Sequence, residues 1–240
     1  MFPQTHVYFA QRVLGHMSDE LALGSIFPDM IINPKLQHKE AHSLGTLLMD
    51  HLNTEKELLD FIRGVITHGI EPNGLDFFGD EKYLEYERGY CFEKARPLVN
   101  QTMRACNIPE QMGWWKAHNI VEMAVELHVC QDNRYGDIIQ KACINNDFIR
   151  YLGSKLPHIC PGISFLQRRI AAFPHYIETH KITTKTLAEK YGTQMSTRHG
   201  VQINTVEVAK LISSATEQIT DDIEDFFQYV QEKITPNLNL

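Results

Sequence analysis

The chain lacks several features that would assign it to a common class of protein. Its five cysteines are widely spaced and never form a CxxC pair, so neither a thiolate zinc site nor a disulfide framework is expected. No apolar run approaches the roughly 18 residues that a membrane span needs. The first residues show no positively charged region followed by an apolar core, so no secretory signal is expected. We therefore expect a cytoplasmic protein.

Positive charge and familiar catalytic motifs are also scarce. The net charge of -7 argues against a partner such as duplex nucleic acid, which favours a basic surface. It does not exclude a phosphorylated substrate held by metal ions, because the ions supply positive charge locally. The sequence contains no GxSxG, Walker-type loop, Rossmann fingerprint or HExxH.

Strand signals are few, and apolar residues recur at helical spacing along the whole chain. We predict an all-α, multi-helix bundle that forms a single domain over residues 1–240. Pro157 and the Pro-Gly pair that follows it mark a boundary between a ligand-bearing part, 1–156, and a ligand-poor helical part, 157–240. The clearest pattern, over 205–234, predicts one long C-terminal helix.

Three local predictions concern the ligand-bearing part. Ser18 is expected to cap a short helix, with two acids in its first turn. Gly24 suggests the end of that helix, and the Phe-Pro step that follows predicts that Asp29 lies on a loop. Asp80 is expected to start a later helix.

What the chain does contain is histidine, unevenly distributed. Eight of the twelve histidines precede residue 130. Imidazoles and carboxylates are costly in a helical core unless something inside needs them, and they are the groups that bind zinc-like divalent ions. The candidate ligands lie in or beside apolar, helix-patterned segments: His6, Asp29, His38, His42, His68, His118 and Glu122.

The sharpest local signal is the pair His118 and Glu122. Spacing of i, i+4 places both side chains on one helical face, close enough to hold a single ion. The alternative is an ordinary surface pair. His38 and His42 have the same spacing, but only one of them need face inward. His128 falls on a different face from Glu122, and we leave it outside the site.

The ordered series of short blocks THVYFAQRVL, LGSIFPDM, HKEAHSLG, FIRGVITHG and AHNIVE resembles the zinc-dependent phospholipase C family. That family includes single-strand-specific nucleases and proteins with a phospholipase C/D domain. The resemblance covers about residues 5–125. It implies an all-helical bundle around up to three zinc ions, with hydrolysis of phosphate esters as the activity.

The resemblance also implies roles for individual residues. His6 looks like the ligand of the first helix, and Asp29 like the carboxylate at a metal pair and a catalytic base. His42 resembles the ligand that follows, with His38 as a rival. The other metal ligands are taken from the Gly-x3-His block and the HxxxE pair: His68, His118 and Glu122.

The chain departs from the family pattern in two places. The family has a bridging Asp one turn after the position of His68, where this chain has Pro72. Glu71 and Asp76 are nearby substitutes, and neither has the expected spacing. Secreted members use their processed amino terminus as a ligand, whereas here five residues precede His6 without a cleavage signal. We therefore expect one metal position to be altered or lost.

The function expected from the sequence is metal-dependent hydrolysis of a small-molecule or lipid phosphodiester, most consistent with zinc. One alternative is a non-catalytic metal-binding or interaction protein that retains a degenerate form of the fold. A second is an HD-type metal phosphohydrolase, but the chain contains no His-Asp dipeptide.

Overall fold

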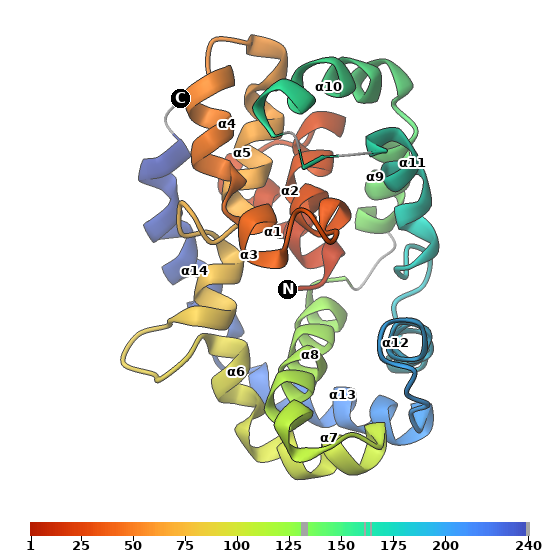
Figure 1. Ribbon diagram of the computed structural model, residues 1–240. Coiled ribbons are helices and arrows are strands. Elements are labelled where there is room, and N and C mark those ends of the chain that lie inside the picture. The colour runs from red at the N-terminus through yellow and green to blue at the C-terminus, as the bar shows by residue number, and fades with distance from the viewer. Residues whose placement is uncertain (131–133, 161, 164, 239–240) are drawn as a thin grey trace.

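The computed structural model describes residues 1–130, 134–160, 162–163 and 165–238. Within them the chain forms fourteen α-helices and no strand, which confirms the all-α prediction (Figure 1). The helices are α1 (Pro3–Leu14), α2 (Asp19–Ile31), α3 (His38–His42), α4 (Leu44–Leu52), α5 (Leu59–His68), α6 (Tyr90–Ala95), α7 (Val99–Cys106), α8 (Glu110–Val129), α9 (Arg134–Cys143), α10 (Asn146–Ile159), α11 (Leu166–Ala172), α12 (Thr184–His199), α13 (Thr205–Ile219) and α14 (Ile223–Ile234).

Two central helices organise the bundle. The first, α2, packs against α1, α5 and α9, in the upper half of Figure 1. The second, α8, packs against α6, α7 and α13 in the lower half. The start of the chain lies between the two groups (Figure 1), and α1 contacts both α2 and α8. Side chains from both central helices therefore meet at this junction.

The close approach of α2 and α5 depends on two glycines. A Cβ atom at Gly24 would lie 2.1 Å from the carbonyl oxygen of Phe61, and one at Gly64 would lie 2.5 Å from that of Leu21. Real Cβ atoms do not approach backbone this closely, so the two helices can cross here only because both positions lack a side chain.

The structure corrects the prediction for Asp29. As expected, the Ser18 hydroxyl accepts a hydrogen bond from the backbone of Leu21 and caps α2. However, α2 continues through Pro28 to Ile31, so Asp29 lies on a helix rather than on a loop. Gly24 lies inside α2 and not at its end, and a glycine is required there because a Cβ atom would collide with the backbone of Phe61 in α5.

The prediction of one long C-terminal helix over 205–234 is also wrong. The segment forms α13 and α14, separated by a turn at 220–222. The apolar stripe is continuous, but Asp222 accepts a hydrogen bond from the Tyr90 hydroxyl at 2.7 Å and pairs with Lys94. Both partners belong to α6. Contacts of Asp222 with α6 therefore accompany the change of direction between α13 and α14.

All five cysteines are buried. Among the described residues, no helix is both long enough and apolar enough to cross a membrane.

Candidate metal centre

The six residues predicted as metal ligands meet at the junction of the two central helices. They come from five helices: His6 from α1, Asp29 from α2, His42 from α3, His68 from α5, and His118 with Glu122 from α8. The four histidine rings and Glu122 are at most 5% exposed, whereas the Asp29 side chain is 28% exposed. Five helices thus bring residues more than 100 positions apart into one buried polar cluster.

Asp76 lies in the middle of this cluster, although its spacing from His68 does not match the pattern expected for a ligand. Its Oδ1 lies 3.3 Å from Nε2 of His6, and its Oδ2 lies 3.3 Å and 3.1 Å from Nε2 of His42 and His68, respectively. Glu71, the other substitute, is exposed. Of the two acids near Pro72, Asp76 is therefore the one that lies in the cluster.

A tight turn explains how Asp76 reaches this place. After α5 ends, the backbone N–H of Gly74 donates to the carbonyl of Gly69 at 2.9 Å. A Cβ atom at Gly74 would lie 2.5 Å from the carbonyl oxygen of Ile66, so the chain folds back directly against the last turn of α5. Helical spacing does not apply across such a turn, which is why counting residues from His68 failed to identify Asp76.

A second group of ligands surrounds His118. Its Nε2 lies 3.6 Å from Oε1 of Glu122 and 3.8 Å from Oδ1 of Asp80. Asp80 does not start an ordinary α-helix, as the sequence suggests, but lies in a short π-helical turn, Phe77–Glu81. Burial and the neighbouring charge of Glu122 raise the pKa of Asp80 well above its ordinary range.

Asp76 and Asp80 are therefore the residues that sequence reasoning missed or misplaced. A signal was present, because the two acids are spaced i, i+4 within the apolar run around LDFFGD. This is the spacing that identified His118 and Glu122. Together the acids and histidines form three groups of potential ligands: His6–His68–Asp76, Asp29–His42–His68 and Asp80–His118–Glu122. Within each group the ligand atoms lie within 4.8 Å of one another.

Hydrogen bonds to the backbone orient three of the histidines. Nδ1 of His42 bonds to the carbonyl of His38 at 2.8 Å, Nδ1 of His68 bonds to that of Ser25 at 2.7 Å, and Nδ1 of His118 bonds to that of Trp115. A carbonyl can only accept, so Nδ1 carries the proton in each ring. The lone pair of the neutral ring is then on Nε2, which faces the carboxylates. This arrangement is typical of histidines that bind metals.

Several atoms of the cluster have no hydrogen-bond partner within the described structure. They include Nε2 of His42, Nε2 of His68 and Oδ1 of Asp80, all of them buried. Buried polar atoms are nearly always satisfied, and unsatisfied ones require an explanation. A bound cation would satisfy all three, so the donor set fits a metal ion.

The Met1 amino group lies between the two parts of the cluster. Its nitrogen is 2.6 Å from Oδ1 of Asp76 and 2.8 Å from Oε1 of Glu122. Burial lowers the pKa of this amine, but Asp76 and Glu122 raise it by a larger amount. The net shift of the pKa is therefore upward. In the metal-free chain an ammonium therefore neutralises part of the negative charge at this position.

The structure separates His42 from its rival. His42 is 1% exposed, and its Nε2 lies 3.5 Å from Oδ1 of Asp29 in addition to its contact with Asp76. His38 is exposed and stacks on the outer side of the His42 ring, with 3.9 Å between centroids. His38 thus lies outside the ligand groups, at the opening of a pocket.

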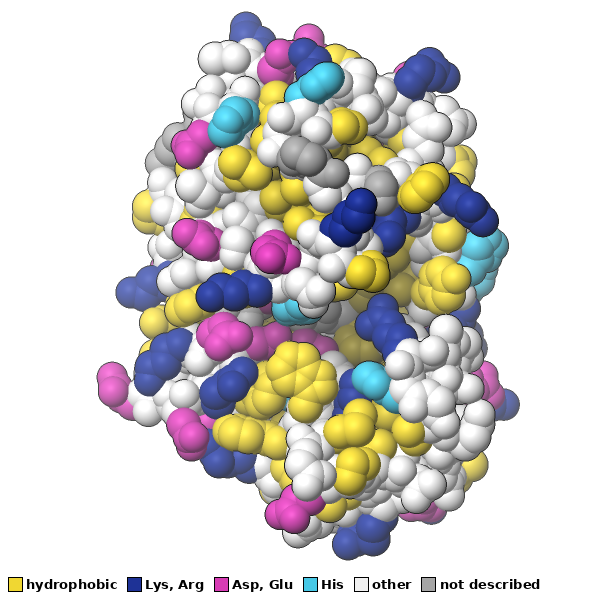
Figure 2. All heavy atoms as spheres, in the orientation of Figure 1, with side chains coloured by type: hydrophobic (Ala, Val, Ile, Leu, Met, Phe, Trp, Pro, Cys, Tyr) yellow, Lys and Arg dark blue, Asp and Glu magenta, His cyan; other side chains and the backbone are white. Residues whose placement is uncertain are grey.

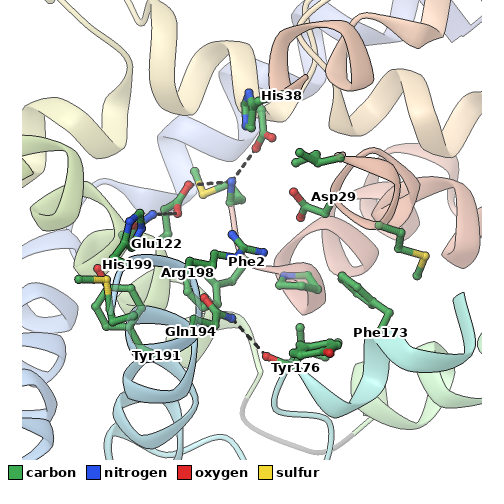
Figure 3. Close-up of a pocket in the computed structure, with 18 of the residues that line it drawn as sticks. Phe2, Asp29, His38, Glu122, Phe173, Tyr176, Tyr191, Gln194, Arg198 and His199 are labelled. Carbon is green, nitrogen blue, oxygen red and sulfur yellow. Dashed lines mark hydrogen bonds and ion pairs between the residues drawn. The ribbon is translucent and has the colours of Figure 1, made fainter. Parts of the chain in front are cut away.

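This pocket has a volume of about 600 Å³. Figure 2 shows the hollow on the face of the molecule, with acidic, basic and hydrophobic side chains around it. Asp29, Asp76, Asp80, His118 and Glu122 line its inner end. Its walls are aromatic and basic, and come mainly from α8, α11, α12 and the segments next to them (Figure 3). The part that the sequence indicates as ligand-poor therefore supplies much of the pocket wall.

Comparison of the chain with protein-family models, with curated proteins and with solved structures gives no match. The resemblance to the zinc-dependent phospholipase C family therefore depends on the short sequence blocks alone.

The charge state of His42 leads to a pH prediction. Burial lowers the pKa of His42, but the Asp29 and Asp76 carboxylates raise it by a larger amount. The net effect raises the pKa of His42 from its ordinary value of 6.5 to about 10. The folded metal-free chain therefore holds this proton more tightly than the unfolded chain does. The resulting stabilisation is complete below pH 6.5 and is lost as the pH rises to about 10. Metal affinity should rise over the same interval, because a metal ion must displace the proton.

The measurements are denaturant unfolding of chelator-treated protein and metal titration, both between pH 6.5 and 9.5. His42→Gln, which cannot titrate, should weaken both pH dependences. Equal slopes in the native protein and in this variant would show that His42 is not protonated between the two carboxylates.

Proposed function

We propose that the protein is a metal-dependent hydrolase of phosphoric esters, with zinc as the metal that best suits its imidazole and carboxylate ligands. The observation that carries the proposal is the Asp76 carboxylate, which is surrounded by the Nε2 atoms of three buried histidines. Two of these Nε2 atoms, those of His42 and His68, have no hydrogen-bond partner among the described residues. A cluster of this composition has no evident structural use, because well-packed apolar residues would stabilise the core at least as well.

We assign one metal position to each ligand group. His6, His68 and Asp76 would hold one ion, Asp29 with His42 a second, and Asp80, His118 and Glu122 a third. Bound divalent ions would lower the pKa of attached water and place positive charge against the phosphate of the ester. Asn119 donates a hydrogen bond to Oε2 of Glu122 at 3.1 Å and so fixes the orientation of this carboxylate.

Asp29 is the residue best placed to act as a base. It is the most exposed member of its ligand group and lines the pocket (Figure 3). Burial raises the pKa of Asp29, but the neighbouring His42 and His68 lower it by a larger amount. The resulting pKa lies well below the ordinary value of 3.8. The carboxylate is therefore ionised at neutral pH, and its free oxygen can orient a water molecule or accept its proton.

The size of the pocket favours a small substrate. A volume of about 600 Å³ falls within the range typical of sites for small molecules. It suits a small phosphodiester or the head group of a lipid better than a nucleic-acid duplex. The non-catalytic alternative would keep the metal cluster without turnover.

The test uses the purified protein, prepared without chelator. We expect at least one equivalent of a divalent transition metal per chain, and hydrolysis of bis(p-nitrophenyl) phosphate that is lost with chelator and restored by zinc. Metal without turnover on any phosphate ester would support the non-catalytic alternative. Well under one equivalent, with no uptake of added zinc, would contradict the metal centre itself.

Two neighbouring ligands on α8 provide a sharper prediction. His118→Ala and Glu122→Ala should each lose the same metal equivalent, because both side chains and Asp80 belong to one ligand group. His128→Ala is the matched control, since it lies on the same helix but about 120° around the axis from Glu122. Elemental analysis of the three variants checks this. The same loss in His128→Ala would show that the wrong face of α8 has been assigned.

A further inference from the structure

One wall of the pocket carries positive charge that no carboxylate neutralises. We call this the cationic wall, defined as Lys116 of α8 with Arg198 and His199 of α12, all of which line the pocket. Arg198 and His199 are labelled in Figure 3. The Lys116 side chain is buried, with the residue 7% exposed, and its ammonium lies 3.0 Å from Nε2 of His199. Within the described residues, neither Lys116 nor Arg198 forms an ion pair.

This arrangement is unusual for a lysine. Buried lysines are almost always paired, because a desolvated charge without a counter-charge is costly. Glu122 acts on Lys116 electrostatically, but it is already bound to the Met1 amino group and to His118. Helix dipoles favour cations in the last turn of α12, which accounts for Arg198 and His199 at this end of the helix. They do not account for Lys116, which reaches the same place from another helix.

A second observation at this wall points to a ligand. Tyr191 lies on α12 seven residues before Arg198, and therefore on the same face of the helix, and it lines the same pocket. The residue is 3% exposed, and its hydroxyl has no hydrogen-bond partner among the described residues. An unsatisfied hydroxyl and two cations without a carboxylate partner, all lining one pocket, are the groups that a site for an oxyanion requires.

The wall is separate from the metal ligands but close to them. Lys116 and Glu122 are six residues apart on α8, which corresponds to about 9 Å along the helix axis. Aromatic side chains, including Phe2, Phe173 and Tyr176, line the same pocket (Figure 3). A substrate that reached both places would therefore carry two anionic groups joined by a short, partly apolar arm.

We propose that the cationic wall binds a second phosphate group of the substrate, so that the preferred substrate is a small phosphodiester whose arm ends in a phosphate monoester. The inference rests on the proposed hydrolase function. The scissile phosphate faces the Asp76 cluster, and the terminal phosphate pairs with Lys116 and Arg198 and accepts a hydrogen bond from Tyr191.

The test compares two substrates that differ only in the second phosphate: thymidine 5′-(p-nitrophenyl phosphate) and the same ester with a 3′-phosphate. We expect the native protein to favour the 3′-phosphorylated ester by at least tenfold in kcat/KM, mainly through KM. Lys116→Met and Arg198→Gln should bring this ratio close to one. Lys185→Met, at the exposed start of α12 and outside the pocket, should keep both rates and the ratio.

Direct binding distinguishes failure of this inference from failure of the proposed function. Thymidine 3′,5′-bisphosphate should bind the chelator-treated protein in calorimetry, and Arg198→Gln, an exposed substitution that leaves the core intact, should weaken that binding at least fivefold. Binding of this kind without any turnover would leave the cationic wall standing and overturn the hydrolase. Metal-dependent turnover with no preference for the 3′-phosphorylated ester would contradict the role proposed for the cationic wall. A preference for that ester that is unchanged in Arg198→Gln would contradict it as well.

Discussion

Replacing Asp76 with asparagine is expected to lower the metal content of the protein and abolish ester hydrolysis. Asp76 is the only carboxylate of the group that it forms with His6 and His68, and it also contacts Nε2 of His42 in the neighbouring group, so the substitution removes negative charge from one group and from beside a second. The asparagine amide keeps the shape of the side chain but carries no negative charge to balance that of a divalent ion. Loss of a residue that merely supports a ligand typically costs 10–100-fold in affinity, so removal of the central ligand should cost at least about 100-fold. Elemental analysis and the rate on bis(p-nitrophenyl) phosphate measure the effect.

Glu71→Ala is the matched control for this substitution. Glu71 is an exposed acid only five residues earlier and was the rival for the same role. It should keep native metal content and native rate, and circular dichroism should show that Asp76→Asn remains helical. A robust native activity that Glu71→Ala abolishes, with Asp76→Asn unaffected, would reverse the assignment.

Gly24→Ala is expected to have the largest effect on stability. The added methyl group would lie 2.1 Å from the Phe61 carbonyl oxygen, a backbone atom that cannot rotate away. Helices α2 and α5 would have to separate. Overpacking of this kind costs about 3 kcal/mol, and more where the obstacle is backbone, so the variant should unfold at much lower denaturant concentration or fail to fold.

The separation should also disturb the metal centre. Nδ1 of His68 on α5 bonds to the carbonyl of Ser25 on α2, which is the residue after Gly24. Gly153→Ala is the control, since a Cβ at this helical position of α10 meets nothing within 4 Å. It should be neutral or stabilise the protein by about 0.5–1 kcal/mol. Gly24→Ala with native stability would show that this helix crossing is not as tight as the structure indicates.

The sequence by itself determined the helical class and most of the ligand types. Periodic apolar residues and caps such as Ser18 are local features, so the helices that they specify can be recognised without the fold. Spacing of i, i+4 on a single helix fixed the geometry of His118 and Glu122 for the same reason. The improbable burial of so many histidines indicated a shared centre.

Only the tertiary structure decided how that centre is completed. Asp76 enters it through a turn whose geometry no helical period describes, and Asp29 through a helix that tolerates an internal proline. His42 rather than His38 faces inward because the close approach of neighbouring helices buries one ring and leaves the other at the opening of the pocket. The cationic wall joins Lys116 to Arg198, more than 80 residues away, and such long-range contacts depend on packing rather than on local pattern.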